Sequence, residues 1–279
     1  MILREYSLPT GWYPRDSQEI SRFLSEFERP SLLSRAAIAP HAGWYYSGRV
    51  AARAVCTLEP KAETVVVLGG HLPSGAPPLF AMEDAVKTPF GPMSIDSELR
   101  SLLQKELNGA EDRYRDNTVE VLLPMVRYFF PNAMLLWLRL PAETASFEAG
   151  RKIFQAASEL NRNVDVLGST DLTHYGLNYG FSPKGTGKAA LRWVREVNDA
   201  NFISAVESGR RDEVLLRAEQ DNSACSAGAV LGAMGFAHEA KPGAAHLLEY
   251  ATSAGVVHDD ANDKEIPDSF VGYAAFTFG

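Results

Sequence analysis

The sequence predicts an α/β fold in which one domain, residues 1–279, has a mostly parallel central sheet covered by helices on both faces. Short β-branched or aliphatic runs alternate along the chain with longer segments of helical periodicity. Several of the short runs are apolar throughout, which is typical of strands buried on both faces. A chain of 279 residues can bury a large core, and no linker divides it.

The expected strands are the short apolar runs, in chain order Ala36–Ala39, Thr64–Leu68, Met134–Leu140, Val164–Leu167, His246–Ala251 and Phe270–Phe276. The expected helices show helical spacing of apolar residues, in chain order Gly48–Leu58, Ser97–Leu107, Val119–Phe130, Ala145–Leu160, Lys188–Val206, Arg211–Ala218 and Ala227–His238. The polar stretch His258–Asp268 is expected to be a surface loop between the last two strands.

Charge and composition exclude several classes of partner. The chain has 35 acidic and 27 basic residues, a formal charge of -8, and no basic cluster longer than Arg210-Arg211, which argues against nucleic acid or an anionic membrane as the main partner. No apolar run approaches the roughly 20 residues that span a bilayer, so we expect a soluble, cytoplasmic protein. Cys56 and Cys225 lie in different contexts and are expected to be thiols.

Three histidines follow strand-like stretches. His41 comes after Ala36–Pro40, His71 ends the run from Thr64 to Gly70, and His174 lies in a loop after a third apolar run. If these strands are neighbours, their carboxyl ends open onto one crevice. The sequence therefore suggests a metal centre, although His41 alone could simply form a hydrogen bond in a tight turn. Imidazole suits zinc, copper, iron and nickel, so the metal is left open.

Cys225 is a candidate third ligand. Good N-capping residues precede it and an Ala/Leu/Met-rich helical pattern follows, so the sequence predicts that Cys225 lies in the first helical turn. The positive end of the helix dipole would there lower the pKa of the thiol and favour the thiolate, which ligates metals or acts as a nucleophile. The alternative is a small buried residue that allows close packing. Cys56 is assigned to the core.

Asp171, His174 and Tyr175 are candidate catalytic residues. An acid three residues from an imidazole can orient it and raise its basicity, which makes His174 the expected general acid/base and Tyr175 a further proton donor. The alternative is that Asp171 forms a turn and His174 is a polar bystander. Glu120 is a further carboxylate whose place near a helix start equally fits capping.

Five motifs in order along the chain resemble the Memo family, whose bacterial and archaeal members are often labelled AmmeMemoRadiSam system protein B. They are Pro40-His41-Ala42-Gly43-Trp44-Tyr45-Tyr46-Ser47-Gly48, Thr88-Pro89-Phe90-Gly91, Val119-Glu120-Val121-Leu122-Leu123-Pro124, Ser169-Thr170-Asp171-Leu172-Thr173-His174-Tyr175-Gly176, and Tyr250-Ala251-Thr252-Ser253 with Val271-Gly272-Tyr273-Ala274. The resemblance runs from about residue 36 to the last residues of the sequence.

The resemblance implies a fold shared with class III extradiol dioxygenases, non-haem iron enzymes that open catechol rings with dioxygen. It assigns the metal positions to His41, His71 and Cys225, and the acid/base position to His174 with Asp171 beside it. The cysteine stands where the dioxygenases carry a metal-binding glutamate.

The chain departs from the family pattern at four positions. Many members have a histidine where Asn117 stands and Gln or His where Leu122 stands. Many also have Ser or Asn where Gly70 stands, and Gly where Ser226 follows the cysteine. These changes bear on hydrogen bonding around the ligands and on substrate polarity.

Three functions are therefore considered. The first is a dioxygenase-like site that holds iron or copper, with zinc also compatible, and carries out oxygen-dependent chemistry on a small aromatic molecule. The second is a non-catalytic metal-handling or peptide-binding regulatory module, in which Trp44, Tyr45 and Tyr46 form an aromatic binding surface rather than ordinary packing. The third is a Cys225 nucleophile activated by His174, without a metal.

Overall fold

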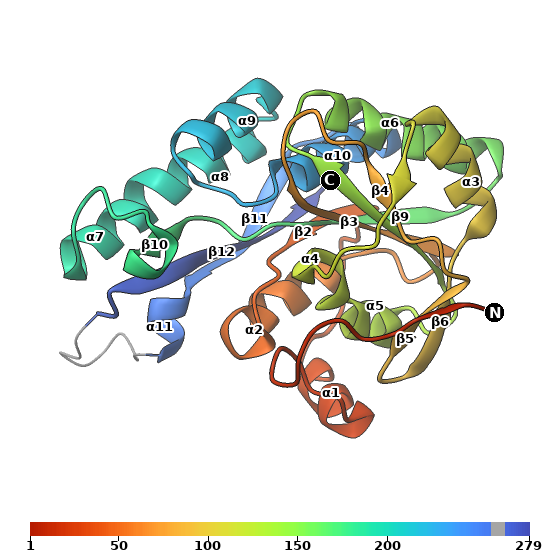
Figure 1. The fold of residues 1–279 in the computed structure, drawn as a ribbon, viewed down its shortest axis with the longest axis horizontal. Coiled ribbons are helices and arrows are strands. Elements are labelled where there is room, and N and C mark those ends of the chain that lie inside the picture. Colours follow the sequence, from red (N-terminus) through yellow and green to blue (C-terminus); the bar gives the residue numbers. More distant parts are fainter. Residues whose placement is uncertain (258–265) are drawn as a thin grey trace.

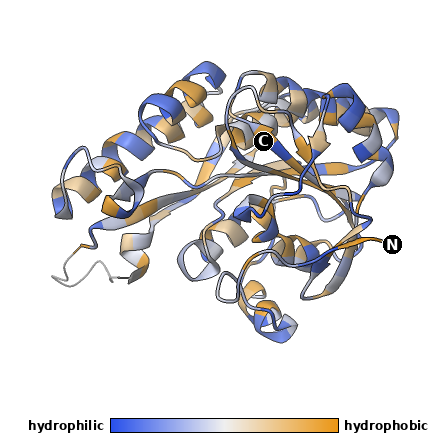
Figure 2. Cartoon of the chain, viewed as in Figure 1, coloured by the Kyte–Doolittle hydropathy of each residue, from blue (hydrophilic) through white to orange (hydrophobic). Residues whose placement is uncertain are grey.

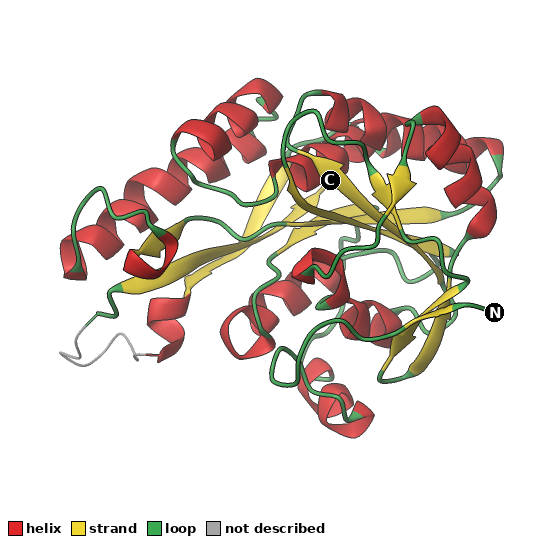
Figure 3. Ribbon diagram, viewed as in Figure 1, coloured by secondary structure: helices red, strands yellow, loops and turns green. Residues whose placement is uncertain are grey.

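The computed structural model describes residues 1–257 and 266–279 and is built around one large sheet (Figures 1 and 3). The strands of this sheet are β2 (Ala36–Ala39), β3 (Thr64–Leu72), β4 (Leu79–Phe80), β7 (Ala110–Glu111), β8 (Met134–Pro141), β9 (Val164–Ser169), β10 (His174–Gly176), β11 (Ala245–Thr252) and β12 (Ser269–Phe278). Their order is β10-β12-β2-β9-β3-β8-β4-β7, and β11 also pairs with β12. All six expected strands are present.

The centre of the sheet is parallel and its flanks are antiparallel. β2, β9, β3 and β8 run parallel to one another, as the sequence predicts. β12 is antiparallel to β2, β10 and β11, and β4 is antiparallel to β8. The predicted α/β class with a parallel core is confirmed, while the antiparallel flanks were not predicted. A separate small sheet contains β1 (Leu3–Arg4), β5 (Ala85–Thr88) and β6 (Gly91–Ser94).

Helices cover both faces of the sheet (Figure 1). They are α1 (Ser17–Leu24), α2 (Trp44–Val55), α3 (Ser97–Glu106), α4 (Asn117–Glu120), α5 (Leu123–Phe129), α6 (Ala145–Glu159), α7 (Gly187–Trp193), α8 (Asp199–Glu207), α9 (Arg211–Gln220), α10 (Ala227–Ala240) and α11 (Ser253–Val257), with a 3₁₀ turn η1 (Leu177–Tyr179) and a π-helical turn η2 (Val194–Asn198). One face packs on α2 and α5, and the other on α3, α6 and α10. Hydrophilic residues recur along outer helices such as α8 and α9 (Figure 2).

Two expected helices are interrupted. The prediction of one helix over Val119–Phe130 is wrong, because α4 ends at Glu120 and α5 starts at Leu123, with Pro124 in its first turn. Proline lacks the N–H that a continuous helix would need there and is well suited to a helix start. The expected helix Lys188–Val206 is α7 and α8 joined by the π-helical turn η2.

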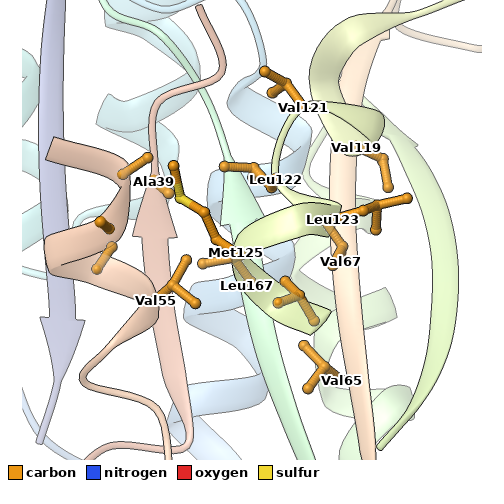
Figure 4. Close-up of a cluster of buried hydrophobic side chains, with 14 of the residues drawn as sticks. Ala39, Val55, Val65, Val67, Val119, Val121, Leu122, Leu123, Met125 and Leu167 are labelled. Carbon is orange, nitrogen blue, oxygen red and sulfur yellow. The ribbon is translucent and has the colours of Figure 1, made fainter. Parts of the chain in front are cut away.

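The apolar cluster beneath the site fixes the strand ends that carry the histidines. Leu122, Leu123 and Met125 pack against residues of β2, β3 and β9 (Figure 4). Of the expected loop His258–Asp268, residues 258–265 lie outside the described residues. Within residues 1–257 and 266–279, no helix is long and apolar enough to cross a membrane.

Candidate metal centre

His41, His71 and Cys225 converge from three parts of the chain. His41 follows β2, His71 lies near the end of β3, and Cys225 immediately precedes the N-cap residue of α10. One ligand atom from each lies within 4.8 Å of the others. Nε2 of His41 is 3.2 Å from Sγ of Cys225, and the two imidazole rings are perpendicular with centroids 5.0 Å apart. The structure thus brings together the three residues proposed as ligands.

A polar partner orients each imidazole. Nδ1 of His41 lies 2.8 Å from Oγ of Ser169, which ends β9 beside β2. Nδ1 of His71 lies 2.9 Å from Oδ2 of Asp116. With both Nδ1 atoms engaged, Nε2 of each ring is left to bind a metal.

Asp116 is held in turn by a buried guanidinium. Arg139 of β8 places its guanidinium 3.3 Å from Oδ2 of Asp116 and 3.3 Å from Oδ1 of Asp112, and its Nε donates to the carbonyl of Gly70 at 3.0 Å. The side chains of all three charged residues are almost fully buried. The orientation of His71 therefore depends on an ion-pair chain whose last member, Asp112, also accepts a hydrogen bond from the indole of Trp137.

The backbone at the end of β3 is shaped for close approach. A Cβ at Gly70 would lie 2.4 Å from Cβ and Oγ of Ser226, so only glycine fits without displacement. The next residue, His71, has a φ of 55°. A non-glycine residue in this left-handed region is strained and persists only where its surroundings fix it. The hydrogen bond from the Gly70 amide to Thr118 and the Asp116 contact of His71 supply that restraint.

Cys225 lies before the helix and not in its first turn, which corrects the sequence prediction. Ser226 is the N-cap residue and α10 begins at Ala227. The chain is still held against the loop after β9, where the amide of Cys225 donates to the carbonyl of Asp171 at 3.2 Å and that of Ser226 donates to Oγ1 of Thr170 at 3.2 Å. These contacts hold Cys225 outside the helix, with its Sγ 3.2 Å from Nε2 of His41.

The two imidazoles and the thiol shift one another's pKa values. Burial opposes ionisation of Cys225, but His41 and His71 outweigh it and hold the pKa of the thiol well below its ordinary value. Burial also opposes protonation of His71, yet Asp116 and Cys225 raise its pKa to about 10. For His41, burial is likewise outweighed, chiefly by Cys225 and then Asp171, so its pKa is raised. The thiolate form that binds metals is therefore stabilised by the two neighbouring imidazoles.

Two of the three candidate ligands, His41 and His71, line a cleft of about 880 Å³, and Sγ of Cys225 lies 3.2 Å behind Nε2 of His41. His41, His71, Asp171 and His174 line it, together with Asn117, whose amide donates to the carbonyl of His41 at 3.0 Å. Part of one wall is the segment Ser7–Tyr13, which we call the N-terminal strap, and which contributes Pro9, Thr10, Gly11 and Trp12 to the lining.

Glu120 holds the strap in place. Its carboxylate accepts hydrogen bonds from the amide of Ser7 at 2.8 Å, the amide of Leu8 at 3.2 Å and the hydroxyl of Tyr13 at 2.9 Å. The Glu120 side chain is 4% exposed. Its role is therefore to anchor a segment more than a hundred residues away in sequence, and not to cap a helix.

The candidate catalytic residues are only partly brought together. Oδ1 of Asp171 accepts from the amides of His41 at 2.7 Å and Ala42 at 3.3 Å, so it orients the turn after β2. Within the described part of the chain, no hydrogen bond joins Asp171 to His174, whose ring instead makes an edge contact with Tyr179 at 5.0 Å. Burial raises the pKa of Asp171, while the positive field of His41 opposes this effect.

Tyr175 faces away from the cleft, which does not agree with its expected role as a proton donor. His174 and Tyr175 are consecutive residues of β10, and side chains alternate between the two sides of a strand. Tyr175 is fully buried and stacks on Phe270 with centroids 5.1 Å apart, and its hydroxyl donates to the carbonyl of Gly185. His174 takes the cleft side of the strand.

The three aromatic residues after His41 divide between core and surface. Trp44 is buried and donates from Nε1 to the carbonyl of Val121 at 2.9 Å, so it belongs to the packing of α2. Tyr46 lines the cleft and pairs edge-on with the exposed Tyr45 at 5.0 Å.

Comparison with known proteins places the chain in a family. The sequence model described as Memo-like protein matches residues 4–277. The chain belongs to the Memo family. It is 30% identical to a MEMO1 family protein of Pyrococcus abyssi (97% of each chain) and 28% identical to one of Methanococcoides burtonii (98% of each chain). A solved structure, an uncharacterized protein from Escherichia coli K12, aligns with 88% of this chain and 100% of its own at 11% identity and a TM-score of 0.47.

The departures of this Memo chain from the family pattern have distinct structural contexts. Leu122 is 1% exposed and lies in the apolar cluster, so it does not face the cleft. Asn117 does line the cleft. Gly70 and Ser226 are in contact, and the space that a side chain at residue 70 would need is filled by the side chain of Ser226. Gly70 and Ser226 therefore pack against each other beside the candidate metal ligands, although they are 156 positions apart in the sequence.

The donor set of this Memo chain fits a divalent transition metal. Two imidazole nitrogens and a thiolate suit copper, zinc or iron. Three protein ligands beside an open cleft leave positions for a further molecule, as in catalytic metal sites. The three candidate ligands could be predicted from the sequence. The roles of Asp116, Arg139 and the strap were missed because no motif indicated them, and the role of Ser169 was missed although it begins one of the Memo motifs.

Proposed function

We propose that this Memo-family protein binds iron or copper, with zinc also compatible, through His41, His71 and Cys225, and acts on a small aromatic molecule in the cleft by oxygen-dependent chemistry. The observation that carries the proposal is the convergence of three ligand atoms within 4.8 Å beside a cleft of about 880 Å³. A bound metal would supply Lewis-acid and redox chemistry. The likeness to class III extradiol dioxygenases supports ring cleavage as the reaction class.

The residues of the chain supply binding and proton transfer. His174 lines the cleft on an edge strand and is placed to take a proton from a phenolic hydroxyl bound there. Asp171 holds the turn that presents His41. Asp116 and Ser169 keep Nε2 of each histidine directed at the metal.

Metal content tests the site. Protein purified without oxygen should contain stoichiometric metal by elemental analysis, and His41→Ala, His71→Ala and Cys225→Ala should lose it. Cys56→Ala is the matched control, because Cys56 is a buried thiol at the end of α2 and belongs to the apolar core. Unchanged metal content in all three ligand variants would contradict the proposal.

Oxygen uptake tests the reaction. Protein reconstituted with iron should consume oxygen in the presence of a catechol, and His174→Ala should reduce the rate without changing metal content. His246→Ala, on β11 and outside the cleft lining, is the control. Absence of uptake from an iron-loaded, intact site would reject the catalytic proposal.

A non-catalytic peptide-binding module is the second candidate. The observation that favours it is the exposure of Tyr45 (69%) and Tyr46 (42%) next to the cleft. Exposed tyrosines are enriched at recognition surfaces. The metal-free nucleophile has less support, because His41 and not His174 lies in hydrogen-bonding distance of Cys225.

A further inference from the structure

The basic groups in the described lining of the cleft are the imidazoles of His41, His71 and His174. Among the described residues that line it there is no lysine or arginine, and the only carboxylate is that of Asp171. The thiolate of Cys225 lies beneath His41 at the same end. A divalent metal would hold His41 and His71 as neutral ligands and would be balanced by this thiolate and by Asp171. No lysine or arginine of the described lining then offers a counter-charge to an anionic substituent of the ligand.

Aromatic rings form much of the rest of the lining. Trp12 comes from the N-terminal strap, Tyr46 from α2, Tyr179 from η1 and Tyr273 from β12. Burial and then the negative charge of Asp171 raise the pKa values of Tyr179 and Tyr273, so these phenols stay neutral. The faces of neutral aromatic rings attract cations and repel a carboxylate.

We propose that the cleft selects an aromatic ligand whose ring substituent is neutral or cationic, and discriminates against one that carries a carboxylate or a phosphate. This inference rests on the proposed function, because it concerns the part of the ligand that lies beyond the metal. An anionic group buried here would lose its hydration without gaining a counter-ion. A cationic group would lie among aromatic rings and near Asp171.

Binding to zinc-loaded protein measures this selectivity without turnover, because zinc has no redox chemistry. The probes are three catechols with different substituents at the same ring position: 4-methylcatechol, dopamine and 3,4-dihydroxyphenylacetate. Titration calorimetry should give dissociation constants for the first two that are about tenfold or more below that of the carboxylate. The difference between dopamine and the carboxylate should shrink as the ionic strength rises.

A positive charge introduced into the cleft should reverse the order of affinity for dopamine and 3,4-dihydroxyphenylacetate. Asn178 lies on η1, is exposed and lines the cleft, so Asn178→Lys places an ammonium group there. The variant should bind 3,4-dihydroxyphenylacetate more tightly than dopamine. Asn201→Lys is the matched control, because it makes the same charge change at an exposed residue of α8 that does not line the cleft.

The outcomes separate this inference from the proposed function. If the carboxylate binds wild-type protein as tightly as dopamine, or if Asn178→Lys and Asn201→Lys have equal effects, the charge selectivity is wrong while aromatic binding stands. If none of the three catechols binds to the zinc-loaded protein, both the inference and the aromatic-ligand function are rejected.

Discussion

A methyl group at residue 70 should disturb the metal site through Ser226. In Gly70→Ala the new Cβ would lie 2.4 Å from Cβ and Oγ of Ser226 and 2.8 Å from its Cα, well inside van der Waals contact. Ser226 cannot yield freely, because its amide is bonded to Thr170 and it is the N-cap residue of α10. Forcing a methyl group into a packed site costs about 1–3 kcal/mol. The displacement also reaches metal ligands on both sides, since His71 follows Gly70 and Cys225 precedes Ser226.

A double-mutant cycle isolates this contact. Urea unfolding of the metal-free protein should show Gly70→Ala destabilised by about 1–3 kcal/mol. Ser226→Gly should cost about 1 kcal/mol, from backbone freedom and lost packing. The double variant should be more stable than the sum predicts by about 1 kcal/mol or more, because Cβ and Oγ of Ser226 are gone. Chelator competition should show the same partial rescue of metal affinity. Additive effects, or a neutral Gly70→Ala, would refute the reasoning.

Three further predictions concern groups around the site and at the opposite end of the sheet. Asp116→Asn removes the charged acceptor of His71 and should lower metal affinity by about 10-fold to 100-fold in chelator competition; unchanged affinity would show that Asp116 does not orient the ligand. Asp165 has both oxygens buried without a hydrogen-bond partner, and burial raises its pKa from 3.8 to about 8. The folded state therefore keeps this proton to higher pH than the unfolded state does, and the protein loses stability as the pH rises from 3.8 to about 8. Asp165→Asn should flatten the dependence of the unfolding free energy on pH between pH 5 and pH 8. An equal slope of unfolding free energy against pH in wild type and variant would contradict this. Glu120→Gln puts an amide donor against the donors of the strap and should cost about 1–3 kcal/mol, and limited proteolysis should then cut within residues 7–13 while metal content is unchanged.

The candidate metal ligands could be predicted because their signals are local. His41 and His71 follow short apolar runs that predict strands, and parallel strands open at one edge of the sheet. Cys225 lies next to a helix that begins at Ala227, as expected, although Cys225 itself precedes the helix and is not in its first turn. The resemblance to the Memo family then assigned His41, His71 and Cys225 to one metal site.

The residues that were missed depend on contacts distant in sequence or on strand geometry. Glu120 contacts partners 107 to 113 residues away, and nothing in its own neighbourhood indicates them. Tyr175 was placed in the site because the segment was read as a loop. Once residues 174–176 form a strand, alternation sends His174 to the cleft and Tyr175 to the core.

The order of the ligands along the chain bears on when the protein can acquire its metal. His41 and His71 are synthesised early, whereas Cys225 comes late and its loop is held by the segment after β9. β12 lies inside the sheet between β11 and β2, so the strand that precedes His41 gains this neighbour only after Cys225 has been synthesised. A nascent chain therefore presents two imidazoles without their thiolate. Assembly of the three candidate ligands is therefore expected only after both Cys225 and β12 have been synthesised, so the cellular metal supply acts on the folded protein.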